Sequence, residues 1–129
     1  MSGVTIGGVR LLLRAEGACI LFVSLLAYSK FGTGWGTFAL LFLVPDLSFF
    51  GYLAGSRVGA FLYNTAHSYI GAVIALSTGV FFGHSLAISI GLIWCAHIGF
   101  DRMLGYGLKY SAGFGFTHLG LIGRARAGT

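Results

Sequence analysis

The chain has 129 residues, of which 57% are hydrophobic and only 9% are charged. About a quarter of the residues of a soluble globular protein are charged, so this composition excludes that class and favours a membrane protein with a single domain. The formal net charge of +5 at pH 7 comes from basic residues scattered at the edges of apolar stretches, which indicates membrane topology and excludes a nucleic-acid binder.

Four apolar stretches follow one another, each close to the ~20 residues that a helix needs to cross a bilayer. They cover residues 11–28, 36–54, 60–82 and 86–105. Short links that contain glycine join them, which predicts an all-α membrane protein whose four transmembrane helices form an up-down antiparallel bundle. Pro45 should kink the second helix and free a carbonyl one turn back. Residues 1–110 form the predicted transmembrane domain, and residues 111–129 form a glycine-rich basic tail.

Lysine and arginine residues set the predicted orientation, because they are in excess in cytoplasmic loops. Lys30 stands alone in the link between the first two spans. The other basic residues fall near the N-terminus, in the middle link, after the fourth span and in the tail: Arg10, Arg14, Arg57, Arg102, Lys109, Arg124 and Arg126. Both termini, and with them the tail, are therefore predicted to be cytoplasmic.

Polar residues within the spans gather at one depth. At a rise of about 1.5 Å per residue, six of them fall in the cytoplasmic half of the membrane: Glu16, Asp46, Asn64, His67, His97 and Asp101. An ionisable group in hydrocarbon costs about 2.5–3.5 kcal/mol on insertion scales, so each requires a partner or a function. Asn64 and His67 are three residues apart and His97 and Asp101 four, so each pair shares a helix face.

Carboxylates and imidazoles that converge inside a four-helix bundle are typical of di-iron carboxylate proteins, and zinc requires only three or four such ligands. The first hypothesis is a site for zinc, iron or manganese, with Asp46, His67, His97 and Asp101 as ligands. Its metal would activate water for attack on a lipid-like or amphipathic substrate, with Glu16 and Asp46 as the candidate catalytic residues and Glu16 as a fifth ligand or general base. The residues predicted to surround the ligands are Asn64, Arg102, Tyr106 and His118.

A second hypothesis assigns the same groups no catalysis. Arg14, Arg57 and Arg102 lie at the same interface as the three acids, so the charges could neutralise one another in a structural network. The protein would then be an accessory subunit, a small carrier or a proton path, with the bilayer, a second copy or another membrane protein as partner. The sequence leaves open whether the protein is an enzyme.

Five strings are shared with a known family: RLLLRAEG, LLFLVPDLSFFGYLAG, VGAFLYNTAHSY, IWCAHIGFDRMLGYGLKY and FTHLGLIGR. On these strings the chain resembles, from about Leu12 to Arg124, a bacterial family of small membrane proteins, domain of unknown function 4260. The resemblance implies a compact multi-pass protein of the bacterial inner membrane, with the polar residues belonging to the family's motifs. It implies no activity, cofactor or substrate.

Overall fold

The computed structural model describes residues 7–106, 109–110, 113–117 and 120–121. In this part of the chain, four helical stretches are long and apolar enough to cross a membrane, and they cover Gly7–Phe31, Trp35–Ala54, Ser56–Phe82 and Ser85–Leu104. The predicted number of spans is confirmed, and the predicted boundaries agree with these to within four residues.

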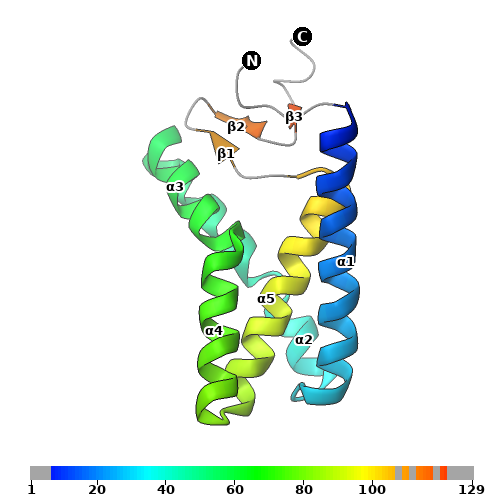
Figure 1. The fold of residues 1–129 in the computed structure, drawn as a ribbon. Helices are drawn as coiled ribbons and strands as arrows, with labels where there is room; N and C mark the ends of the chain where they lie inside the picture. Colours follow the sequence, from blue (N-terminus) through cyan, green and yellow to red (C-terminus); the bar gives the residue numbers. More distant parts are fainter. Residues whose placement is uncertain (1–6, 107–108, 111–112, 118–119, 122–129) are drawn as a thin grey trace.

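The first and last spans are single helices, α1 (Gly7–Phe31) and α5 (Ser85–Leu104). Helix α5 lies between α1 and α4 (Tyr69–Phe82) and is the most buried span (Figure 1). Both hydrophobic clusters of the core contain residues of α5, Leu92 and Ile93 in one and Cys95 and Ile98 in the other. The remaining spans expose many large apolar side chains, as expected of helices that face lipid.

Glycines allow α1 and α5 to approach closely. A Cβ atom on Gly17 would lie 2.9 Å from the carbonyl oxygen of Gly99, and one on Gly99 would lie 2.7 Å from the carbonyl oxygen of Gly17. Membrane helices associate through such small residues, because lipid provides no hydrophobic force between them. This contact fixes α1 against the end of α5 that carries the polar residues.

The second span is interrupted. Helix α2 (Trp35–Leu41) ends, and a 3₁₀ helix, η1 (Val44–Ala54), begins around Pro45. Proline has no N–H to donate to the carbonyl of Leu41, and the N–H of Asp46 donates to Leu43 at 3.0 Å instead of to Phe42. The break therefore removes the α-helical donors from two successive carbonyls, and it brings Asp46 to the start of a new helix.

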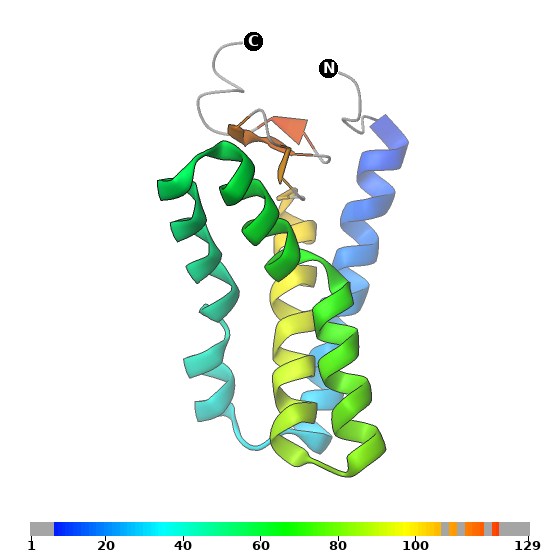
Figure 2. The same ribbon diagram turned by 90° about the vertical axis from the view of Figure 1, so that its left-hand side faces the viewer.

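The third span is also interrupted, whereas the sequence analysis predicted one continuous helix over residues 60–82. Helix α3 (Ser56–His67) ends at Ser68, whose backbone is extended (φ −91°, ψ 153°), and α4 begins at Tyr69. Helix α3 leans away from the axis of α4 and pairs with η1 (Figure 2). The break places His67 at a helix end, inside the membrane-spanning region.

Side chains of α5 satisfy the carbonyls that this second break exposes. The indole N–H of Trp94 donates to the carbonyl of Ala66, and Nη2 of Arg102 donates to the carbonyl of His67 at 2.9 Å. Irregular backbone in a membrane persists only where protein or a cavity provides such partners. Helix α5 thus holds the broken span in place.

Helices α4 and α5 are joined by a turn at Gly83, whose positive φ of 65° suits glycine. Three short strands follow α5, namely β1 (Lys109–Tyr110), β2 (Gly113–Thr117) and β3 (Gly120–Leu121). They form an antiparallel sheet in the order β1-β2-β3, at the same end of the molecule as the start of α1 (Figure 1). The sequence analysis did not predict this sheet, although residues 113–116 alternate glycine with phenylalanine.

Candidate metal centre

Four side chains from three separate segments converge where the two broken spans meet α5. Asp46 belongs to the first turn of η1, His67 is the last residue of α3, and His97 and Asp101 lie one turn apart on α5. One ligand atom of each lies within 4.8 Å of the others. These are the four residues that the sequence predicted as metal ligands.

The distances between the ligand atoms are short and nearly equal. Nε2 of His67 lies 3.1 Å from Nε2 of His97, and 3.3 Å from both Oδ1 of Asp46 and Oδ2 of Asp101. Nε2 of His97 lies 3.2 Å from Oδ1 of Asp46 and 3.3 Å from Oδ2 of Asp101. Metal–ligand bonds of about 2.0–2.1 Å would place neighbouring atoms of a tetrahedron about 3.3 Å apart. Five of the six pairs therefore have the spacing of a four-coordinate metal site.

A backbone carbonyl sets the tautomer of His67. Nδ1 of His67 lies 3.0 Å from the carbonyl oxygen of Tyr63, one turn earlier in α3. Because a carbonyl only accepts, Nδ1 carries the proton, and Nε2 of the neutral ring presents a lone pair. The Tyr63 ring stacks on the imidazole, with centroids 3.8 Å apart and planes 8° apart, which fixes the orientation of the ring.

His97 is held by residues of the break in the second span. The Phe42 ring meets the imidazole edge-on, with centroids 5.1 Å apart. Nδ1 of His97 is buried and forms no hydrogen bond within the described residues. The interruption at Pro45 thus supplies Asp46, and the Phe42 ring that precedes it packs on the second histidine.

The convergence of these groups favours a proton or a metal ion between them. The Nε2 lone pair of neutral His67 faces a second imidazole nitrogen and two carboxylate oxygens, and carboxylates only accept. Acceptors at 3.1–3.3 Å repel one another unless a proton or a metal ion lies between them.

Burial is uneven around the centre. The side chains of His67 and His97 are 3% and 2% exposed, whereas those of Asp101 and Asp46 are 17% and 35% exposed. The histidines thus form the buried side of the metal centre, and the aspartates form its solvent-accessible side. Solvent or substrate can therefore reach the centre from the side of the two aspartates.

Two of the arginines of the hypothetical charge network, Arg14 and Arg102, donate hydrogen bonds to backbone carbonyls. Nε of Arg14 donates to the carbonyl of Met103 at 2.9 Å, and Arg102 donates to the carbonyl of His67. Within the described part of the chain, the ion pairs link histidine with aspartate. Arg14 and Arg102 therefore join helix ends, while the carboxylates of Asp46 and Asp101 face the histidines.

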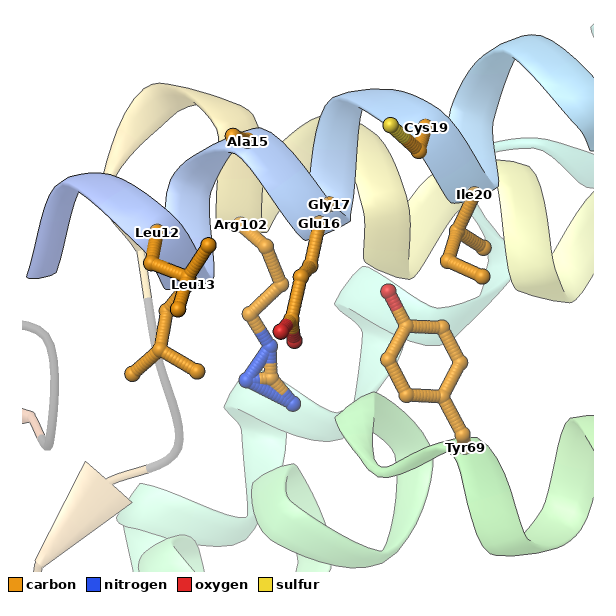
Figure 3. Close-up of a pocket in the computed structure, with 9 residues that line it drawn as sticks. All are labelled: Leu12, Leu13, Ala15, Glu16, Gly17, Cys19, Ile20, Tyr69 and Arg102. Carbon is orange, nitrogen blue, oxygen red and sulfur yellow. The ribbon is translucent and has the colours of Figure 1, made fainter. Parts of the chain in front are cut away.

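The structure places the remaining predicted residues that it describes outside the group of four. Glu16 lines a separate cavity with Arg102 (Figure 3). Asn64 lies in α3, where its carbonyl accepts from the N–H of Ser68. Tyr106 follows α5, with its N–H donating to the carbonyl of Asp101, and His118 lies outside the described residues. Of the predicted surrounding residues, Arg102 and Tyr106 are thus tied to ligand residues, through the backbone carbonyls of His67 and Asp101.

Sequence reasoning missed the residues that orient the ligands. Tyr63 and Phe42 contact the two histidines, and Trp94 holds the end of α3. The spacing of Tyr63 and His67 is i, i+4, which places them on one helix face and could have indicated the pair. The contacts of Phe42 and Trp94 depend on the helix breaks, so the local sequence carried no such signal.

Comparison with known proteins supports the resemblance seen in the sequence. The family model described as a domain of unknown function (DUF4260) matches residues 10–122, which is most of the chain. Neither the curated proteins nor the solved structures contain a match. All four ligand candidates and both helix breaks lie within the matched residues. The chain therefore belongs to the DUF4260 family.

Proposed function

We propose that this protein is an integral membrane metalloprotein that binds one divalent metal ion through Asp46, His67, His97 and Asp101. The single observation that carries the proposal is the convergence of four acceptor atoms, five of whose six separations are 3.1–3.3 Å, with the lone pair of His67 directed inward by the Tyr63 carbonyl. Two nitrogens and two carboxylate oxygens suit zinc, iron or manganese.

The proposed chemistry is hydrolysis of a lipid-like or amphipathic molecule. A bound metal of this kind supplies a polarised water at neutral pH. Asp46, the most exposed of the four side chains, lies where it can accept a proton from that water. A cavity of about 310 Å³ supports an apolar substrate, because its lining includes Pro45, Ala66 and Trp94, which neighbour the ligands along the helices.

The proposal includes an orientation. The four spans form an antiparallel bundle in the bacterial inner membrane with both termini in the cytoplasm, and the tail lies on that side. Support comes from the basic residues at the ends of the spans, with Lys30 in the opposite link. The metal centre then lies beneath the cytoplasmic face.

Elemental analysis of untagged protein, purified in mild detergent, tests metal binding directly. We expect about one zinc, iron or manganese ion per chain in the wild type, and loss of that ion in His67→Ala and in His97→Ala. His84→Ala is the matched control, because His84 is exposed at the start of α5, outside the centre, and should retain the ion.

Folded wild-type protein without metal, and with a melting temperature that chelators leave unchanged, would refute the proposal. A non-enzymatic role as an accessory subunit, carrier or proton path would then be favoured. If metal is present, phospholipid hydrolysis in proteoliposomes, followed by mass spectrometry, tests the reaction. Activity that persists in Asp46→Asn at the wild-type rate would contradict the role assigned to that carboxylate.

A further inference from the structure

A second site lies along α1, in a cavity of about 530 Å³ (Figure 3). Its wall is formed by residues of α1, among them Leu12, Leu13 and Ile20, and it is closed by Tyr69 at the start of α4 and Arg102 on α5. Leu12 and Ile20 are exposed on the membrane-spanning surface of α1, so the cavity opens sideways, toward lipid. Its volume lies in the range of ligand pockets, about 300–1,000 Å³.

The polar groups of this cavity face one another. The carboxylate of Glu16 points toward the guanidinium of Arg102, and the hydroxyl of Tyr69 points into the same space (Figure 3). Arg102 is 9% exposed, and its guanidinium carbon lies 5.7 Å from the centroid of the Tyr69 ring. The cavity therefore combines an apolar wall with one positive, one negative and one hydroxyl group.

Two of these groups have unused capacity for a ligand. The hydroxyl of Tyr69 is buried and has no hydrogen-bond partner among the described residues, and a buried polar group in that condition is destabilising. Glu16 is exposed within an apolar span, where an ionised carboxylate is costly. The described ion pairs do not include one between Glu16 and Arg102, whose Nη2 is bound to the His67 carbonyl.

We infer that this cavity binds one phospholipid of the surrounding bilayer with a zwitterionic head, in which a phosphate is linked to a primary ammonium. The phosphate accepts hydrogen bonds from Arg102 and Tyr69, and the ammonium pairs with Glu16. One acyl chain lies along Leu12, Leu13 and Ile20. A purely anionic head fits less well, because its phosphate can pair with Arg102 but it carries no ammonium to compensate the negative charge of Glu16. The lining of the cavity contains none of the four candidate metal ligands.

Native mass spectrometry of the detergent-purified chain, titrated with phosphatidylethanolamine, phosphatidylcholine or phosphatidylglycerol, tests this inference. We expect one phosphatidylethanolamine to bind at least several times more tightly than either other lipid. Tyr69→Phe should weaken that binding about tenfold, the effect of one lost hydrogen bond to a charged group. The variant should keep the melting temperature of the wild type or exceed it, because the hydroxyl has no partner in the protein.

Glu16→Gln tests the charge pairing. The preference for phosphatidylethanolamine over phosphatidylglycerol should disappear or reverse, since the amide no longer attracts the ammonium or repels an anion. Tyr106→Phe is the control, because Tyr106 is an exposed tyrosine beyond the end of α5 and should bind lipid as the wild type does. Equal binding of the three lipids by the wild type, or variants of Glu16 and Tyr69 that behave like Tyr106→Phe, would overturn the inference.

Discussion

Replacing Asp101 by asparagine should stabilise the metal-free protein and abolish its stabilisation by zinc. Ligand oxygens of Asp46 and Asp101 lie within 4.8 Å of each other. At an effective dielectric constant near 20, two unit charges at that separation repel by about 3.5 kcal/mol. Solvent reaches roughly a third of the Asp46 side chain and screens its charge. We therefore expect the removal of one charge to raise the free energy of unfolding of the metal-free protein by about 1–2 kcal/mol.

Thermal unfolding in detergent measures this effect, at about pH 8, where free imidazole is neutral. For a chain of this size, a gain of about 1–2 kcal/mol corresponds to a rise in Tm of roughly 4–8 °C. We expect chelator-treated Asp101→Asn to melt higher than chelator-treated wild type by that amount. Zinc at a hundred times its Kd should stabilise the wild type by about 2.7 kcal/mol, and the variant much less.

A lower Tm of metal-free Asp101→Asn than of the metal-free wild type would refute the reasoning. If the four groups form a structural network of protonated histidine and aspartate, Asp101→Asn removes an attraction, and the metal-free variant melts lower than the wild type. Glu16→Gln is the matched control, because it also converts an acid to its amide within a span, but outside the group of four. It should leave the zinc-dependent rise in Tm unchanged.

Two further predictions concern the framework of the site. Gly17→Ala should destabilise the protein by about 3 kcal/mol, because the new Cβ overlaps Cβ of Arg102. Gly8→Ala is the control and should be neutral or slightly stabilising, because a Cβ there has nothing within 4 Å. Equal Tm values for the two variants would contradict the α1–α5 contact. Pro45→Ala should restore an N–H for the Leu41 carbonyl, raise the helix content seen by circular dichroism and weaken zinc binding about tenfold to a hundredfold. Unchanged zinc affinity, measured by calorimetry, would show that the break does not position Asp46.

The sequence predicted the framework well because the membrane limits the choices. An apolar stretch of about 20 residues has few alternatives to a spanning helix, so the four spans were identified to within four residues at each end. The candidate ligands could be selected because ionisable residues inside such spans are costly and therefore rare. Helical spacing then placed His97 and Asp101 on one face of α5.

The helix breaks could be predicted only in part. Pro45 predicts the interruption of the second span, because proline lacks the backbone N–H that a continuous helix requires. Ser68 carries no comparable signal, and its extended backbone is stable because Trp94 and Arg102 satisfy the carbonyls of Ala66 and His67. Such donors come from a helix about thirty residues away along the chain, so no local pattern contains them.

By itself, the sequence determined the number of spans, their approximate ends and the depth of the acids and histidines, since these follow from hydrophobicity and from the rise of a helix. Only the tertiary structure decided which groups meet. It joined Asp46, His67, His97 and Asp101, and it placed Glu16 in a separate cavity with Tyr69 and Arg102. The physical reason is that depth fixes one coordinate of a side chain, whereas helix packing and the two breaks fix the direction in which it points.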